Sequence, residues 1–119
     1  MWRECFRVLR PGGRLLVGFT QPVVYLFDCD EVDRGGDLVV RHSIPYADPT
    51  SLTSAQLHQR VANGETLEFG HTIEDQIGGQ LDAGFVLHAL FEDRHDNPID
   101  LYINTYVATL ARKPCQLTA

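Results

Sequence analysis

The stretch Arg7-Val8-Leu9-Arg10-Pro11-Gly12-Gly13-Arg14-Leu15-Leu16-Val17 decides the fold that we expect for this chain. Apolar residues at helical spacing lead into it and predict an amphipathic helix with one packing face: Trp2, Cys5, Phe6 and Leu9. Pro11 cannot continue that helix, and Gly12-Gly13 permit the positive φ angles of a chain that reverses. The apolar run 15–17 has the pattern of a strand covered on both faces. The stretch therefore predicts a helix, a tight turn and a buried strand.

Later segments complete the predicted strand–helix–strand plan. Thr72 and Asp75 suit a helix start, and Gly78-Gly79 inside that helix indicates a close backbone contact with another element. Strands are predicted over 85–91 and 101–111 from their β-branched and aromatic residues. Because a helix joins strand 14–19 to the second strand, we expect these two to run parallel, with the final strand antiparallel to its predecessor.

Residues 21–70 interrupt this plan. The apolar cluster 23–27 must be buried or line a pocket. Beyond it the sequence predicts a surface turn over 28–36, a strand over 38–44, a turn at 47–50 and a short helix that Thr53 or Ser54 caps.

The helix–turn–strand stretch resembles the "RVLKPGG" segment of class I S-adenosylmethionine-dependent methyltransferases. Residues 70–85, GHTIEDQIGGQLDAGF, resemble a signature of one bacterial branch of that family, and residues 106–114 resemble its last strand. The resemblance implies an α/β fold, the C-terminal half of a Rossmann-like methyltransferase. Its small mixed sheet would have flanking helices and an antiparallel final strand between the other two. Residues 1–119 would form a single domain.

The cofactor site of that family has no counterpart in the sequence. The family holds S-adenosylmethionine on a glycine-rich turn after its first strand, with an acidic residue after the second. The glycine pairs at 12–13, 35–36 and 78–79 lie in other contexts. We therefore expect the substrate-side portion of a methyltransferase, which alone binds no cofactor and is inactive. The alternatives are a non-enzymatic module that dimerises or binds a partner, and a metal-dependent hydrolase.

Candidate substrate-binding residues follow from position. In open α/β sheets ligands bind beyond the carboxyl ends of strands, where strand 14–19 leads into Thr20. The resemblance implies that residues 21–70 form a substrate lid and that the segment around His71 faces the site. The candidates are Thr20, Tyr25, Phe27, Phe69, His71, Glu74 and Gln76. Alternatively, His71 and Thr72 cap a helix and the aromatic residues belong to the core. None of the candidates has an assigned catalytic role.

Composition limits the possible partners. The net charge of −6 gives no electrostatic reason to expect nucleic-acid binding. No apolar run approaches the roughly 20 residues that span a bilayer, so no membrane partner is expected. The three separated cysteines suit a reducing cytoplasm. His71 with Glu74, and the acidic residues around His95, lack the ligand number of a metal site, so no metal is expected.

The resemblance also implies an unpaired sheet edge. In the family the strand that corresponds to 14–19 pairs on its other side with a strand that this sequence lacks. An apolar unpaired edge is a template for association, so we expect a homo-oligomer through this edge. The sequence does not identify the methyl acceptor.

Overall fold

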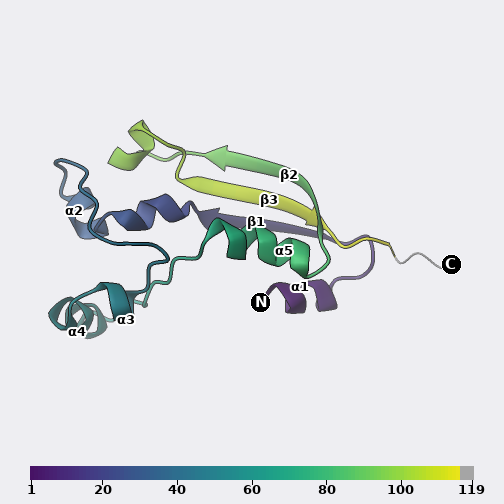
Figure 1. Ribbon diagram of the computed structural model, residues 1–119, viewed down its shortest axis with the longest axis horizontal. Coiled ribbons are helices and arrows are strands. Elements are labelled where there is room, and N and C mark those ends of the chain that lie inside the picture. The colour runs from purple at the N-terminus through teal and green to yellow at the C-terminus, as the bar shows by residue number, and fades with distance from the viewer. Residues whose placement is uncertain (116–119) are drawn as a thin grey trace.

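The structure is a computed structural model that describes residues 1–115. The molecule is elongated, with extents of 58 × 30 × 22 Å. A three-stranded sheet occupies one part of its length, and a group of short helices from residues 21–70 occupies the other (Figure 1).

The sheet has the order β1-β3-β2, and both of its ladders are antiparallel. The strands are β1 (Arg14–Thr20), β2 (Val86–Asp93) and β3 (Tyr106–Arg112). Because β3 runs antiparallel to both neighbours, β1 and β2 run parallel to each other across it. The predicted placement of the final strand between the other two is confirmed. Thr20, expected just past the first strand, is its last residue.

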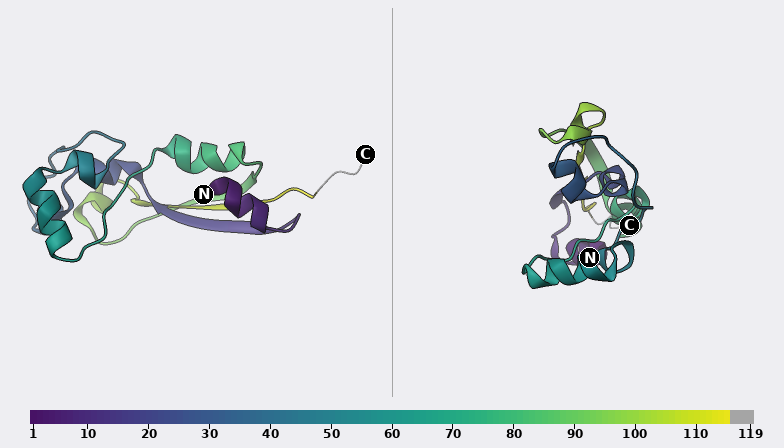
Figure 2. Two further views of the ribbon diagram at one scale, coloured as in Figure 1. Left: turned by 90° about the horizontal axis from the view of Figure 1, so that it is seen from below. Right: turned by 90° about the vertical axis from the view of Figure 1, so that its left-hand side faces the viewer.

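One face of the sheet is covered by helices (Figure 2). The Trp2 indole donates a hydrogen bond to the Asp75 carbonyl (2.9 Å) and thereby joins the two helical segments. A Cβ atom on Gly79 would overlap the Trp2 indole, which confirms the predicted close contact for Gly79. A Cβ atom on Gly78 would meet Glu74 of the same helical segment at an ordinary distance. The helical segments are α1 (Trp2–Val8), a π-helical turn (Glu74–Gly78) and α5 (Gly79–Asp82).

A buried polar pair joins α5 to the central strand. Gln80 and Thr109 are both fully buried. Gln80 Nε2 donates hydrogen bonds to Thr109 Oγ1 (3.0 Å) and to the Gln76 carbonyl (2.9 Å). Leaving such a group unpaired costs about 1–3 kcal/mol, so the pair fixes the position of α5 over β3.

The C-terminal end of α1 is held by Lys113, the residue that follows β3. Lys113 Nζ donates hydrogen bonds to the carbonyl oxygens of Phe6 (2.7 Å) and Leu9 (2.9 Å). The same ammonium group lies 4.4 Å from the centroid of the Phe6 ring. A cation at the C-terminal carbonyls of a helix also opposes the helix dipole, which adds to the attraction.

No helix of residues 1–115 covers the other face of the sheet (Figure 2). Leu16 on β1 is 72% exposed, and Phe91 on β2 is exposed on the same face. The prediction of a first strand covered on both faces is therefore wrong for the described residues. Side chains of β1 alternate between exposed and partly buried, because packing elements lie on one side only.

Short helices dominate residues 21–70. Thr53 caps α4 in the predicted way, since its hydroxyl accepts from the Gln56 amide (3.2 Å) and the Gln56 side chain accepts from the Thr53 amide (3.0 Å). The helices are a 3-10 turn (Pro22–Leu26), α2 (Cys29–Asp33), α3 (Asp48–Ser51) and α4 (Ser54–Ala62).

Three local predictions are wrong here. The expected surface turn over 28–36 contains α2, because the Asp28 carboxylate caps it by accepting from the Glu31 amide (3.0 Å). The expected turn at 47–50 belongs to α3. The expected strand over 38–44 is an extended segment with one bridge, Val40 to Phe27. Among residues 1–115, no neighbouring strand lies beside this segment to complete a ladder.

The final strand is shorter than the predicted 101–111. A 3-10 turn (Pro98–Leu101) occupies the start of that range. The buried Asp100 carboxylate accepts hydrogen bonds from the Thr105 hydroxyl and the Asn97 amide, which hold residues 97–105 as a compact loop. Among the described residues, no helix is long and apolar enough to cross a membrane.

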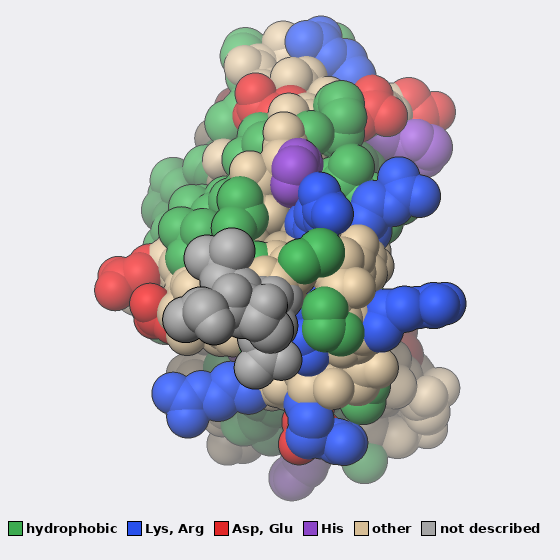
Figure 3. Space-filling model, turned by 90° about the vertical axis from the view of Figure 1, so that its right-hand side faces the viewer, with side chains coloured by type: hydrophobic (Ala, Val, Ile, Leu, Met, Phe, Trp, Pro, Cys, Tyr) green, Lys and Arg blue, Asp and Glu red, His purple; other side chains and the backbone are tan. Residues whose placement is uncertain are grey.

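Charge is distributed unevenly along the molecule. Figure 3 faces the end near the C-terminus, where Lys and Arg side chains are spread among apolar ones. Basic residues of α1 and of the neighbouring strand ends belong to this part: Arg3, Arg7, Arg10, Arg14, Arg112 and Lys113. Residues 21–70, in contrast, contain eight acidic and three basic residues.

We expect Gly79→Ala to lower the free energy of unfolding by about 1–3 kcal/mol, because the new methyl group would overlap the Trp2 indole. The matched control is Gly78→Ala, whose Cβ would meet the Glu74 Cγ at an ordinary 3.7 Å. There the higher helix propensity of alanine should leave stability equal or raise it by up to about 1 kcal/mol. Urea denaturation followed by circular dichroism measures both; equal losses would contradict the proposed contact.

Candidate functional site

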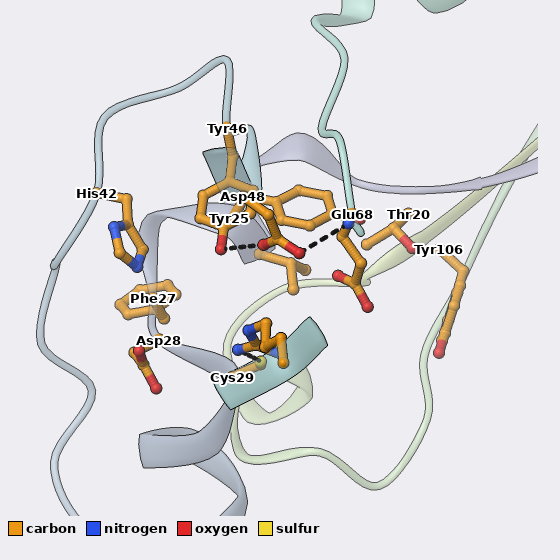
Figure 4. A pocket seen from close by; sticks show the side chains of 12 residues that line it. Thr20, Tyr25, Phe27, Asp28, Cys29, His42, Tyr46, Asp48, Glu68 and Tyr106 are labelled. Carbon is orange, nitrogen blue, oxygen red and sulfur yellow. Dashed lines mark hydrogen bonds between the residues drawn. The ribbon is translucent and has the colours of Figure 1, made fainter. Parts of the chain in front are cut away.

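A cavity of about 220 Å³ lies where the carboxyl end of β1 meets residues 21–70 (Figure 4). We call it the β1 cavity. Its walls come from β1, the 3-10 turn that follows, the start of α2, and the chain segments 46–48 and 68. The side chains that line the cavity include Thr20, Tyr25, Phe27, Asp28, Cys29, His42, Tyr46, Asp48, Arg60, Glu68 and Tyr106.

Aromatic side chains form one side of the β1 cavity. Tyr25 stacks on Tyr46 with ring centroids 5.3 Å apart and planes inclined by 18°. His42 lies edge-on against Tyr46, with 5.0 Å between centroids. A Cβ on Gly70 would lie 2.9 Å from the Tyr25 ring, so the bare backbone there lets the ring pack against it. These contacts hold Tyr25 in place without any contribution from a ligand.

The carboxylate of Asp48 joins two segments of the cavity wall. Asp48 is 2% exposed, and its two oxygens accept from the Tyr46 hydroxyl and from the Glu68 amide (2.8 Å). The Asp48 amide donates back to the Glu68 carbonyl (3.0 Å), and the Gly70 amide donates to the Tyr46 carbonyl (2.7 Å). Burial raises the pKa of Tyr46 strongly, and the hydrogen bond to Asp48 adds to the shift. Asp48 is therefore a structural acid whose acceptors are in use.

Cys29 and Arg60 form another side of the β1 cavity. Arg60 Nη2 donates to Cys29 Sγ (3.4 Å), and the Arg60 guanidinium also pairs with Asp30 and Glu65, each at 3.5 Å. Burial raises the pKa of the Cys29 thiol despite the nearby guanidinium. The thiol therefore stays protonated at neutral pH, and Cys29 is unsuited to nucleophilic catalysis.

The predicted site residues separate into two groups. Thr20, Tyr25 and Phe27 line the β1 cavity. His71, Glu74 and Gln76 line a different hollow of about 430 Å³, beside Trp2 at the start of α1. Phe69, which is 53% exposed, lines neither hollow.

The direction of the backbone explains why Phe69 lies apart from the β1 cavity. Ala47 and Phe69 form an antiparallel bridge, so successive residues of segment 68–70 point in opposite directions. Glu68 faces the β1 cavity, and Phe69 faces away from it (Figure 4 shows Glu68). The next turn begins a helix, where the Thr72 hydroxyl accepts from the Asp75 amide (3.0 Å) as the capping interpretation predicts.

Sequence reasoning missed most of the polar wall. Glu68, Asp48 and Tyr46 were not candidates, because the bond that joins Asp48 to Glu68 spans twenty residues and no local motif indicates it. A weak signal exists in Tyr46 and Asp48: residues two apart in an extended chain share a side, so the pair could have been expected to point together. Within residues 1–115, no cluster of three or more His, Cys, Asp or Glu side chains could hold a metal ion.

No protein-family model matches the chain. Over 113 residues it is 49% identical to YbaJ of Bacillus subtilis (strain 168), an "uncharacterized methyltransferase". The chain is homologous to part of a methyltransferase. The match covers 95% of this chain and 44% of YbaJ, so the chain spans less than half the length of that relative.

A solved structure supports the same fold. It is a "putative S-adenosylmethionine dependent methyltransferase" from Listeria monocytogenes, with a TM-score of 0.57 and 14% sequence identity. The match covers 94% of this chain and 53% of the Listeria chain. The fold is thus a mixed α/β arrangement that corresponds to part of a Rossmann-like methyltransferase, as the sequence predicted.

We expect Tyr46→Phe to lower the free energy of unfolding at pH 7 by about 1–3 kcal/mol, because one oxygen of the buried Asp48 loses its donor. The folded-state pKa of Tyr46 lies above its ordinary value of 10.0, so its contribution is complete below that pH and is lost as the pH rises further. The gap between the wild type and the variant should therefore narrow above about pH 10.

Urea denaturation between pH 7 and pH 11 measures this gap. Tyr102→Phe is the matched control, because Tyr102 is exposed. For Tyr102→Phe, the difference in stability from the wild type should not change with pH. The same constant difference for Tyr46→Phe would contradict the assigned hydrogen bond.

Proposed function

We propose that this chain forms the substrate-side portion of a S-adenosylmethionine-dependent methyltransferase. The observation that carries the proposal is the β1 cavity, in a chain that is 49% identical to part of a methyltransferase. In open α/β sheets ligands bind beyond the carboxyl ends of strands, and this cavity occupies that position. Residues 21–70 act as the lid that covers the methyl acceptor.

The chain's contribution to catalysis in this proposal is positioning. Methyl transfer requires the acceptor to be held in line with the methyl donor, and well-fixed walls supply that orientation. Thr20, Tyr25 and Phe27 contact the acceptor from the β1 cavity. His71, Glu74 and Gln76 lie in the separate hollow and are not part of this acceptor site.

We also propose that these residues alone do not bind the cofactor. The glycines with positive φ among residues 1–115 are Gly12, Gly35, Gly36, Gly64 and Gly84, and none of them lines the β1 cavity. Gly12 belongs to the turn at the amino end of β1, opposite to the cavity. A cofactor cradle needs glycine backbone open to the ligand, and Gly70, beside the cavity, is covered by Tyr25.

Isothermal calorimetry of this chain with S-adenosylmethionine is expected to give no measurable binding. Full-length YbaJ, which contains the additional residues of the relative, serves as the positive control and should bind. Micromolar affinity for the isolated chain would overturn the proposed division of roles. Absence of binding to YbaJ would instead count against the methyltransferase proposal itself.

The unpaired edge of β1 favours a second proposal: two copies of this chain associate through this edge. Strand β1 pairs with β3 on one side only, and its other edge has no partner strand among residues 1–115. Leu16 projects from this strand and is 72% exposed. Pairing of two such edges would satisfy backbone groups and cover apolar surface together. This arrangement would also suit a non-enzymatic module derived from the methyltransferase fold.

Light scattering after size-exclusion chromatography should therefore show a dimer at high protein concentration. Leu16→Lys should shift the population to monomer, because a lysine on an edge strand opposes pairing. Val8→Lys introduces the same change at an exposed site on α1 and should leave the dimer intact. A stable wild-type monomer at high concentration would contradict the proposal.

A further inference from the structure

We propose that the β1 cavity binds an ammonium group and that the methyl acceptor is consequently an amine. Transfer would require the bound ammonium to give one proton to a base, for which the open Glu68 carboxylate is available, so that the nitrogen lone pair can bond to the methyl group while the sulfonium donor leaves as a neutral thioether. The identity of the ligand as acceptor rests on the proposed function, whereas the preference for a cation rests on the cavity itself.

Two carboxylates of the wall have oxygen atoms available. Glu68 is exposed, and its carboxylate makes no hydrogen bond or ion pair with another described residue; Figure 4 shows it directed into the cavity. Asp28 uses one oxygen, Oδ1, to cap α2 through the Glu31 amide, so the second remains open. Asp48, in contrast, has both oxygens engaged. Glu68 and Asp28 therefore give the cavity a negative charge that a ligand can meet.

The cation in the wall does not cancel this charge. The Arg60 side chain is 15% exposed and pairs with Asp30 and Glu65. Its Nη2 also donates to the Cys29 sulfur. Arg60 is the one Lys or Arg among the described residues that line the cavity, and two acids already pair with it. An anionic ligand would therefore meet the Glu68 carboxylate without a free Lys or Arg to offset it.

The apolar part of the wall suits the same class of ligand. Tyr25 and Phe27 present aromatic rings beside the open carboxylates. The negative face of an aromatic ring attracts an ammonium group, and the attraction is stronger where water is excluded. Burial raises the pKa of Tyr25, and the charges of Glu68 and Asp48 raise it further, as expected for a site with negative potential.

The distribution of charge over the whole molecule also favours a cationic ligand in the β1 cavity. Residues 21–70, which form most of the cavity wall, hold eight acidic and three basic residues. The basic residues of α1 and the neighbouring strand ends lie toward the opposite end of the long axis (Figures 1 and 3). A field of this kind concentrates cations near the cavity and repels anions from it.

The test uses three probes of one shape: phenethylammonium, 2-phenylethanol and 3-phenylpropionate. Titration of the isotope-labelled chain, followed by backbone amide shifts, gives each dissociation constant and shows whether residues 25–29 and 68 respond. We expect phenethylammonium to bind about tenfold more tightly than the alcohol, and the carboxylate to bind more weakly than either.

Two variants locate the effect. Glu68→Gln should weaken phenethylammonium binding about tenfold and leave 2-phenylethanol unchanged. Asp28→Asn removes the second charge while keeping the helix cap, because asparagine caps as well as aspartate, and should also weaken binding of the cation. Glu4→Gln removes the same charge from exposed α1 and should change nothing.

The proposal is overturned if the carboxylate binds as tightly as the ammonium probe, if none of the three probes binds, or if neither Glu68→Gln nor Asp28→Asn weakens the cation. These results leave the methyltransferase proposal unaffected, because the probes require no cofactor. Failure of YbaJ to bind S-adenosylmethionine, in turn, would leave cation binding by the cavity intact.

Discussion

The buried carboxylate of Asp48 is the interaction on which the β1 cavity depends. It accepts from a side chain two residues away and from a backbone amide twenty residues away, so one acid fixes both the Tyr46 ring and the direction of Glu68. An acid at 2% exposure is tolerated only when its oxygens are satisfied, and here both are. The ring stack of Tyr25 on Tyr46 and the exit of Glu68 into the cavity both follow from this single constraint.

The sheet part of the molecule follows a different logic. Central strand β3 alone contacts both neighbours, and its helix-facing residues Val107, Thr109 and Ala111 are buried. The helices meet that face through a few specific contacts, among them the Trp2 indole against Gly79 and the Gln80–Thr109 pair. The opposite face remains apolar and open among the described residues. The helix-covered face of the sheet is thus a packed core, and the opposite face is an apolar surface suited to association.

The sequence predicted the parts of the fold that local patterns determine. Helical spacing and proline placed α1 and its turn, the cap expected at Thr53 or Ser54 placed α4, and resemblance to the methyltransferase family placed β3 between β1 and β2. It failed where a segment's partner decides the outcome. Residues 38–44 have strand propensity but no neighbouring strand, and the apolar run of β1 gave no sign that one face would stay open.

The candidate site was predictable to a similar degree. Position after β1 was enough to select Thr20, and the apolar run selected Tyr25 and Phe27. The polar half of the wall was not predictable, since the bridge between Ala47 and Phe69 decides which side chains face inward. A shift of one residue in that bridge would exchange Glu68 for Phe69, so the chemistry of the cavity depends on pairing register and not on composition.

The bond between Lys113 and the carbonyls of α1 has a kinetic consequence. Lys113 lies 107 positions from Phe6 and 104 from Leu9, and among residues 1–115 β1 pairs with a strand about ninety residues later. Contacts so distant in sequence form slowly, because a long loop must close before any of them is gained. The opening helix and strand therefore acquire their native neighbours late in folding. Until then their apolar surface stays unprotected, which makes early intermediates of this chain natural clients for molecular chaperones.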